Sequence, residues 1–162
     1  MELNIEINCE SDKWKGFLAD AELILNDLAN KALEEIGVSN SVEYVEISVL
    51  LTDNNNIRKL NRDYRGKDKP TNVLSFPLEE HDAGNYNSVA EQMLLGDIAL
   101  AYEIILQEAN EQEKSFKHHY THLVLHGILH LLGYDHIEED DAEEMESIEI
   151  NVLEKMEVAN PY

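Results

Sequence analysis

The chain opens with apolar and polar residues in alternation over positions 3–8, the pattern of a strand with one buried face. Over 17–36 the apolar residues instead recur at helical spacing, and Gly37 follows as a helix stop. The same patterns, with their flanking turn residues, predict three further strands and four further helices. The strands are 42–51, 72–76 and 94–99, and the helices are 53–61, 102–113, 116–132 and 140–156. The polar segment 79–92 is predicted to be a mobile loop.

These elements predict an α+β fold, a small mixed sheet of about four strands packed with helices. The patterns do not predict the strand order. A length of 162 residues suits a single domain, 1–162, with one core. No apolar run is long enough for a membrane span, and residues 1–15 lack the basic start and apolar block of a secretory signal. The single cysteine, Cys9, excludes an internal disulfide. We therefore expect a cytoplasmic protein.

Charge is distributed unevenly along the chain, whose formal net charge is −22. An acidic chain repels nucleic acid at long range. Six of the twelve lysines and arginines nevertheless fall between Arg58 and Lys69, whereas residues 138–149 contain eight acids. The acidic run is typical of a solvated helix face. The basic cluster is either another solvated face or a site that binds an anion.

Five of the seven histidines fall on the predicted helix 116–132, and His136 follows it closely. His126 and His130 are four residues apart, so a helix presents both imidazoles on one face, within reach of one tetrahedral metal. Gly133 is placed to end the helix in a left-handed conformation, which would bring His136 back to the same ion. Three neutral histidines leave one position open for water, as in catalytic zinc sites. The sequence therefore predicts one zinc ion per chain at His126, His130 and His136.

The remaining histidines are predicted to have lesser roles. His122 shares the face of the first two ligands one turn earlier, and we expect it to support or pack against them rather than to bind the metal. His118 and His119 are expected to face solvent at the start of the helix. His81, in the predicted loop, is expected to be incidental.

The spacing from His126 to His136, with Gly133 between them, matches the metzincin protease pattern H-E-x-x-H-x-x-G-x-x-H. The proteases place their general base, a glutamate, directly after the first histidine. This chain has Gly127 there, and glycine cannot accept a proton. The sequence therefore predicts a zincin-like metal-binding helix without the complete peptidase machinery.

Residues 126–136 read HGILHLLGYDH, which resembles the H-G-x-L-H-L-x-G-Y-D-H signature of the YbeY family. These are bacterial metal-dependent endoribonucleases that also serve in ribosomal RNA maturation. Two more segments are similar to family motifs in the same order. Residues 61–77 contain the N-x-x-Y-R and T-N-V-L-S-F-P blocks, and residues 95–98 read LGDI.

The resemblance implies an α+β fold, zinc at the three histidines and single-stranded RNA as the substrate. It also implies that Arg65, the arginine of the Y-R pair, is functional. Processing of the 3′ end of 16S ribosomal RNA, ribosome quality control, and ribosomal proteins or the small ribosomal subunit as partners come from the same resemblance.

On this hypothesis zinc would activate water, and Arg65 would steady the phosphate through its planar fork of donors. The predicted catalytic residues are thus Arg65 and His126. Asp135 is either the general base or a residue that orients His136. Three more polar residues either line the cleft or form hydrogen bonds at turns and strand ends: Asn72, Ser75 and Asp97.

Two alternatives stay open. The first is a metalloprotease or amidohydrolase on the same scaffold, against which Gly127 argues. The second is a ribosome-assembly factor without catalytic activity, in which the zinc is structural and the basic cluster docks on RNA or a ribosomal protein.

Overall fold

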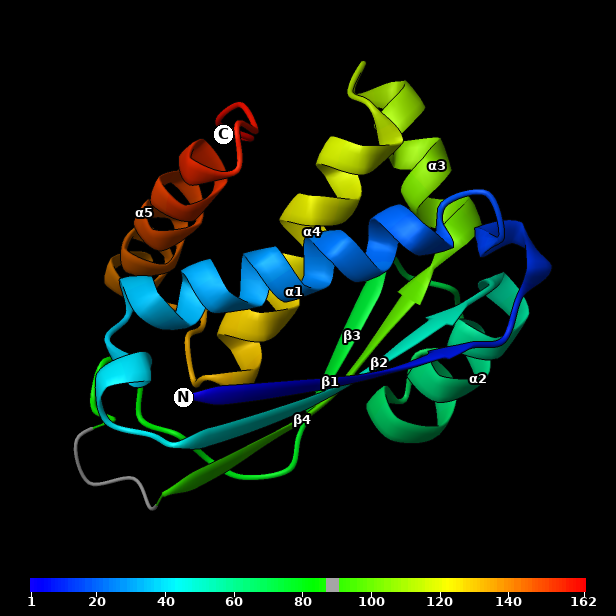
Figure 1. The fold of residues 1–162 in the computed structure, drawn as a ribbon. Coiled ribbons are helices and arrows are strands. Elements are labelled where there is room, and N and C mark those ends of the chain that lie inside the picture. The colour runs from blue at the N-terminus through cyan, green and yellow to red at the C-terminus, as the bar shows by residue number, and fades with distance from the viewer. Residues whose placement is uncertain (87–90) are drawn as a thin grey trace.

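The computed structural model describes residues 1–86 and 91–162 (Figure 1). Of the segment 79–92, predicted to be a mobile loop, residues 87–90 lie outside the described residues. Residues 79–86 have no helix or strand, and Gln92 already belongs to a strand. Within the described ranges, no helix combines the length and apolar character needed to cross a bilayer.

The described residues form one four-stranded sheet with the strand order β1-β2-β4-β3. The strands are β1 (Glu2–Cys9), β2 (Tyr44–Thr52), β3 (Val73–Pro77) and β4 (Gln92–Ala101). β2 pairs in parallel with both β1 and β4, whereas β3 pairs antiparallel with β4. The predicted mixed sheet of about four strands is confirmed. β3 is an edge strand, so one side of its backbone is free to contact other parts of the chain.

Five α-helices surround the sheet in the part of the chain that the structure describes. They are α1 (Leu18–Glu35), α2 (Asn54–Arg65), α3 (Tyr102–Glu111), α4 (Phe116–Leu131) and α5 (Glu139–Lys155). All predicted helix and strand bounds agree within two residues except the end of α2, which lies four residues later than expected. The helix continues through Arg65 because residues 62–65 are all compatible with a helix, and it ends at Gly66, which has positive φ.

The helices form two layers on opposite faces of the sheet (Figure 1). α2 covers one face, where its Ile57 packs in a small apolar cluster with residues of β3 and β4. α1, α3, α4 and α5 lie on the other face over the larger core. α4 packs directly against β3 and β4. This packing brings the histidine-bearing helix beside the free edge of the sheet.

Candidate metal centre

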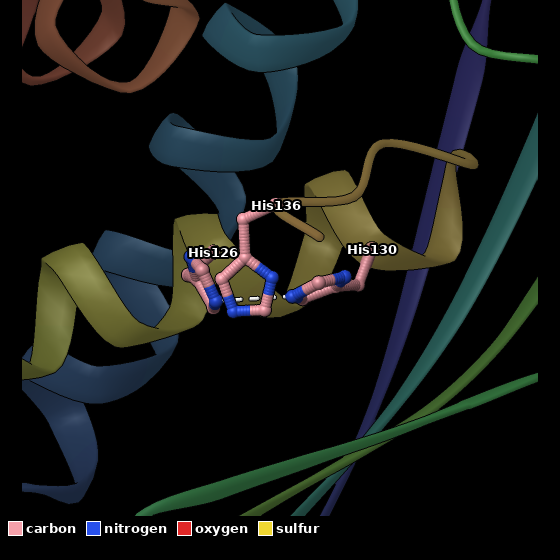
Figure 2. Close-up of side chains that lie close together, drawn as sticks. All are labelled: His126, His130 and His136. Atoms are coloured by element: carbon pink, nitrogen blue, oxygen red, sulfur yellow. Dashed lines mark hydrogen bonds between the residues drawn. The ribbon is translucent and has the colours of Figure 1, made fainter. Parts of the chain in front are cut away.

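α4 holds two of the predicted metal ligands in a fixed orientation. The helix begins at the Ser115 cap, whose side chain accepts a hydrogen bond from the backbone N–H of His118. Most of its apolar residues are buried, while the half-buried His126 and His130 project together from the remaining face. Their Nε2 atoms lie 3.0 Å apart (Figure 2). In a tetrahedral zinc centre with bonds of about 2.1 Å, ligand nitrogens are separated by about 3.4 Å. The helix pair therefore has nearly the spacing that a metal requires.

The turn at Gly133 brings the third imidazole to this pair. Gly133 has φ of 96°, so its predicted left-handed conformation is confirmed. A Cβ at this position would lie 2.2 Å from the carbonyl oxygen of His81, so the site excludes any side chain. After the turn the chain runs back over α4, and the ring of His136 lies beside the rings of His126 and His130 (Figure 2).

The three histidines make a group that can hold a metal ion, because their candidate ligand atoms all lie within 4.8 Å of one another. Burial lowers the pKa of His130, and the neighbouring histidines lower it further. The neutral, ligating form of His130 is therefore favoured. The Nδ1–H of His130 donates to the carbonyl oxygen of Tyr134 at 3.1 Å, which leaves Nε2 free as the ligand atom. The donor set consists of imidazole nitrogens, so these residues fit a zinc-like ion.

A buried carboxylate that the sequence analysis missed lies behind the centre. Glu149 of α5 has no exposed surface, and its Oε1 accepts a hydrogen bond of 2.8 Å from Nδ1 of His126. Its Oε2 accepts from Nε2 of His122 at 2.7 Å and from the hydroxyl of Tyr162 at 2.6 Å. Burial raises the pKa of Glu149, but these three hydrogen bonds outweigh it and lower the pKa to about 2. Glu149 is therefore a carboxylate at neutral pH.

The sequence contains a signal that could have identified Glu149. On α5 it follows the buried Met145 by four positions and precedes the buried Val152 by three, so it lies on the apolar stripe. A glutamate on a buried stripe requires hydrogen-bonding partners. In the sequence it was hidden within the acidic run 138–149.

The other histidines follow the predictions only in part. His122 contacts Glu149, as expected of a residue that supports the ligands. His118 is exposed as predicted, but His119 is not. His119 is buried, with Nε2 3.0 Å from Oε1 of Glu108, because the helix turns that side chain toward α3. Burial lowers the pKa of His119.

A cleft of about 810 Å³ joins the three histidines to the basic cluster. Arg65, Lys67 and Lys69 line it. The guanidinium of Arg65 donates through Nη2 to the carbonyl oxygen of Ser75 on the free edge of β3, and it lies 5.4 Å from the ring of Phe76. Arg65 and the metal group thus share one cleft.

The rest of the basic cluster is divided. Arg58 pairs with Asp68 at 2.8 Å, and Arg62 pairs with Asp63 at 2.9 Å. Neither arginine lines the cleft. The cationic wall of the cleft is therefore formed by the second half of the basic cluster, from Arg65 to Lys69.

Of the three polar residues proposed for the cleft wall, Asn72 and Ser75 line it and Asp97 does not. Ile98 contacts Gly127 on the α4 side of the sheet, and successive strand residues face opposite sides, so Asp97 faces the other layer. Of the two alternatives for Asp97, a place in the cleft wall is therefore excluded. Asp135 accepts the backbone N–H of His136 at 2.6 Å, and its Oδ1 lies 3.4 Å from the ring Nδ1 of His136.

The structure is that of an α+β protein with a mixed four-stranded sheet. It has a candidate metal centre in a basic cleft, where two imidazoles come from one helix at the sheet edge and a third is brought back by the turn at Gly133. The family model described as Endoribonuclease YbeY matches residues 6–157. The chain belongs to the YbeY endoribonuclease family.

Individual relatives agree over nearly the whole chain. An Endoribonuclease YbeY of Bradyrhizobium diazoefficiens is 46% identical over 157 residues, which are 97% of this chain and 84% of the relative. An Endoribonuclease YbeY of Paramagnetospirillum magneticum is 42% identical over 163 residues, and the match covers 100% of this chain and 96% of the relative. The solution structure of TM1509 from Thermotoga maritima is similar with a TM-score of 0.57 and 27% identity, covering 96% of this chain and 91% of that chain.

Proposed function

We propose that this chain is a zinc-dependent endoribonuclease that cleaves single-stranded RNA in ribosomal RNA maturation, including processing of the 16S 3′ end and ribosome quality control. One observation carries the proposal: three convergent imidazoles and an exposed arginine share a cleft in a chain of the YbeY family. The unit that acts is residues 1–162 as one hydrolase domain.

The histidines and the arginine of the cleft have different roles in this proposal. His126, His130 and His136 would hold zinc, which when bound supplies a Lewis acid for the scissile phosphate and for water. Arg65 binds the phosphate through its planar fork, and its contact with Ser75 fixes the guanidinium at the edge of β3. Catalysis thus depends on Arg65 directly and on His126 as a metal ligand.

Two lysines extend the phosphate site along the cleft wall. Lys67 and Lys69 follow Arg65 on the same wall, where they attract the flanking phosphates of a single strand. Asp135 acts as the residue that orients His136, because its carboxylate contacts both the backbone and the ring of that ligand. The general base is not assigned to any side chain.

The contacts of Gly127 argue against the protease alternative. A Cβ at Gly127 would lie 3.2–3.3 Å from side-chain atoms of Ile98 and Ser75, so a larger residue here would have to displace these neighbours. The chain therefore has no side chain at the position where those proteases carry their general base. An assay of peptide cleavage beside RNA cleavage separates the two activities.

The proposal places the protein in the cytoplasm with ribosomal RNA as its partner and with ribosomal proteins or the small ribosomal subunit as further contacts. The alternative of an assembly factor without catalysis makes a different prediction. In that case a His126→Ala variant, or metal-free protein, would keep full biological activity.

The decisive experiment measures metal content and RNA cleavage on the same preparation. We expect about one zinc per chain, bound through imidazole nitrogens, and cleavage of single-stranded RNA that a chelator abolishes and added zinc restores. Elemental analysis and X-ray absorption identify the ion, with protein purified without a nickel column because imidazole sites also bind nickel. Sulfur ligation, or full cleavage by metal-free protein, would contradict the proposal.

A further inference from the structure

Glu149 and its hydrogen-bond partners form a network behind the three histidines. We propose that Glu149 is the positioning residue that holds His126 in the tautomer presenting Nε2 to the metal. This inference rests on the metal binding proposed above. It does not depend on which substrate the enzyme cleaves.

His126 can carry its ring proton on either of two nitrogens. A neutral imidazole carries one N–H, and its position is set by the hydrogen bond that the ring makes. Glu149 is fully buried, and its two carboxyl oxygens contact three N–H or O–H groups at 2.6–2.8 Å, so these oxygens act as hydrogen-bond acceptors. Its contact of 2.8 Å therefore fixes the proton of His126 on Nδ1. The lone pair of Nε2 is then directed toward His130, 3.0 Å away.

The two helix ligands differ in the acceptor that Nδ1 contacts. Nδ1 of His130 is hydrogen-bonded to the backbone carbonyl of Tyr134, whereas Nδ1 of His126 is hydrogen-bonded to the carboxylate of Glu149. A carboxylate makes the opposite nitrogen more basic than a carbonyl does, because it stabilises positive charge on the ring. Glu149 thus both orients His126 and strengthens it as a ligand.

A second group of possible metal ligands overlaps the first at His126. His122, His126 and Glu149 also have candidate ligand atoms within 4.8 Å of one another. Their contacts, however, have hydrogen-bond lengths, and the hydroxyl of Tyr162 occupies the same oxygen of Glu149 as His122 does. An ion there would also need Nδ1 of His126 without its proton. The network is therefore a set of hydrogen bonds behind a single metal.

The test measures metal affinity in two variants of Glu149 by competition with a chromophoric zinc chelator. Glu149→Gln keeps the shape and an acceptor oxygen but removes the charge, and we expect affinity to fall about tenfold. Glu149→Ala removes the acceptor, and we expect a fall of about a hundredfold. The matched control is Glu108→Gln, which alters a histidine–carboxylate contact of α4 that does not involve Glu149, at His119, and should leave affinity unchanged.

A second readout separates positioning from general destabilisation. In metal-free protein labelled with ¹⁵N, long-range proton–nitrogen spectra report which ring nitrogen of His126 carries the proton. We expect Nδ1–H in the parent and in Glu108→Gln. We expect a shift toward Nε2–H in Glu149→Ala, since neutral histidine free in water favours that form. If Glu149→Ala does not fold, the affinity of Glu149→Gln decides.

Zinc affinity in Glu149→Gln within about twofold of the parent would overturn the proposal. Two ions per parent chain, one of them lost in Glu149→Gln, would also overturn it and assign a second metal site. RNA cleavage is not a readout here. A parent protein that binds one zinc tightly and cleaves no RNA would refute the proposed function and leave the role of Glu149 standing.

Discussion

At the scale of single residues, the turn at Gly133 decides whether the third ligand can reach the other two. The left-handed backbone conformation disfavours any side chain, and the carbonyl of His81 fills the space where a Cβ would lie. Two independent constraints therefore require glycine here. His136 depends on both.

We expect Gly133→Ala to lower the free energy of unfolding by about 1–3 kcal/mol from backbone strain, with a further loss from the contact with His81. The relaxed turn would displace His136, so zinc affinity should fall as well. Denaturant titration and chelator competition measure the two effects. Gly37→Ala is the matched control, because Gly37 has φ of 82° but open space around it, far along the chain from the centre. Equal zinc affinity in both variants would contradict this account.

RNA cleavage should depend on the guanidinium geometry of Arg65 and not only on its positive charge. Arg65→Lys keeps the positive charge but loses the planar fork that binds phosphate with two hydrogen bonds. We expect RNA cleavage to fall by at least about tenfold, with zinc content and thermal unfolding unchanged. The control is Arg62→Lys, whose side chain pairs with Asp63 outside the cleft. Cleavage by Arg65→Lys at the parent rate would exclude phosphate recognition by that residue.

At the scale of elements, α4 carries histidines in two environments. His126 and His130 face the cleft, whereas His119 is buried against Glu108 of α3. Burial lowers the pKa of His119 from its ordinary value of 6.5, so the folded protein keeps this residue neutral at a pH where the unfolded chain protonates it. Acid therefore favours the unfolded state through His119.

We expect the free energy of unfolding of metal-free protein to decrease as pH falls from about 7.5 to about 5.5. The stabilisation is complete above pH 6.5 and is lost as pH falls through the lower pKa of folded His119. His119→Gln should reduce this slope, and His118→Gln, on the exposed neighbour, should not. The measurement is denaturant unfolding at a series of pH values. Identical slopes in parent and His119→Gln would show that the contact with Glu108 compensates for burial.

The elements themselves were predictable because local patterns determine them. Apolar spacing and turn residues located the four strands and five α-helices of the described residues but not the two short 3-10 helices, and the histidine spacing with Gly133 located the metal group. What could not be predicted depends on packing between distant segments. The parallel pairing of β1 with β2 and of β2 with β4 leaves no local trace in the sequence. In the sequence Glu149 and His119 resemble surface residues, and they are buried only because α5 and α3 pack against α4.

At the scale of the whole molecule, a strongly acidic protein presents a basic cleft. The formal net charge is −22, yet Arg65, Lys67 and Lys69 line the wall beside the metal group. The acids on the rest of the surface repel RNA, while the cleft attracts it locally. Salt screens both effects, so the salt dependence of binding reports how many phosphates the cleft contacts.

We expect the logarithm of the RNA binding constant to fall linearly with the logarithm of salt concentration, by about 0.7 per phosphate contact for a single strand. Lys67→Gln and Lys69→Gln should each reduce the steepness of this line by about that amount. Lys155→Gln, which loses a pair with Glu35 at the end of α5, should leave it unchanged. Fluorescence anisotropy with a short labelled RNA measures all four proteins. A parental slope in both cleft variants would place the RNA elsewhere.

The three imidazoles differ in exposure, and this difference affects how fast a bound ion exchanges rather than how tightly it binds. The side chain of His136 is 55% exposed, whereas that of His126 is 21% exposed and held by Glu149. His136 also sits on a loop, and loops open far more often than buried helices unfold. Ion exchange would therefore begin with the departure of His136, while α4 stays intact as a two-ligand receptor. A centre built in this way can be tight at equilibrium and still give up its ion to a competing chelator on the timescale of loop motion.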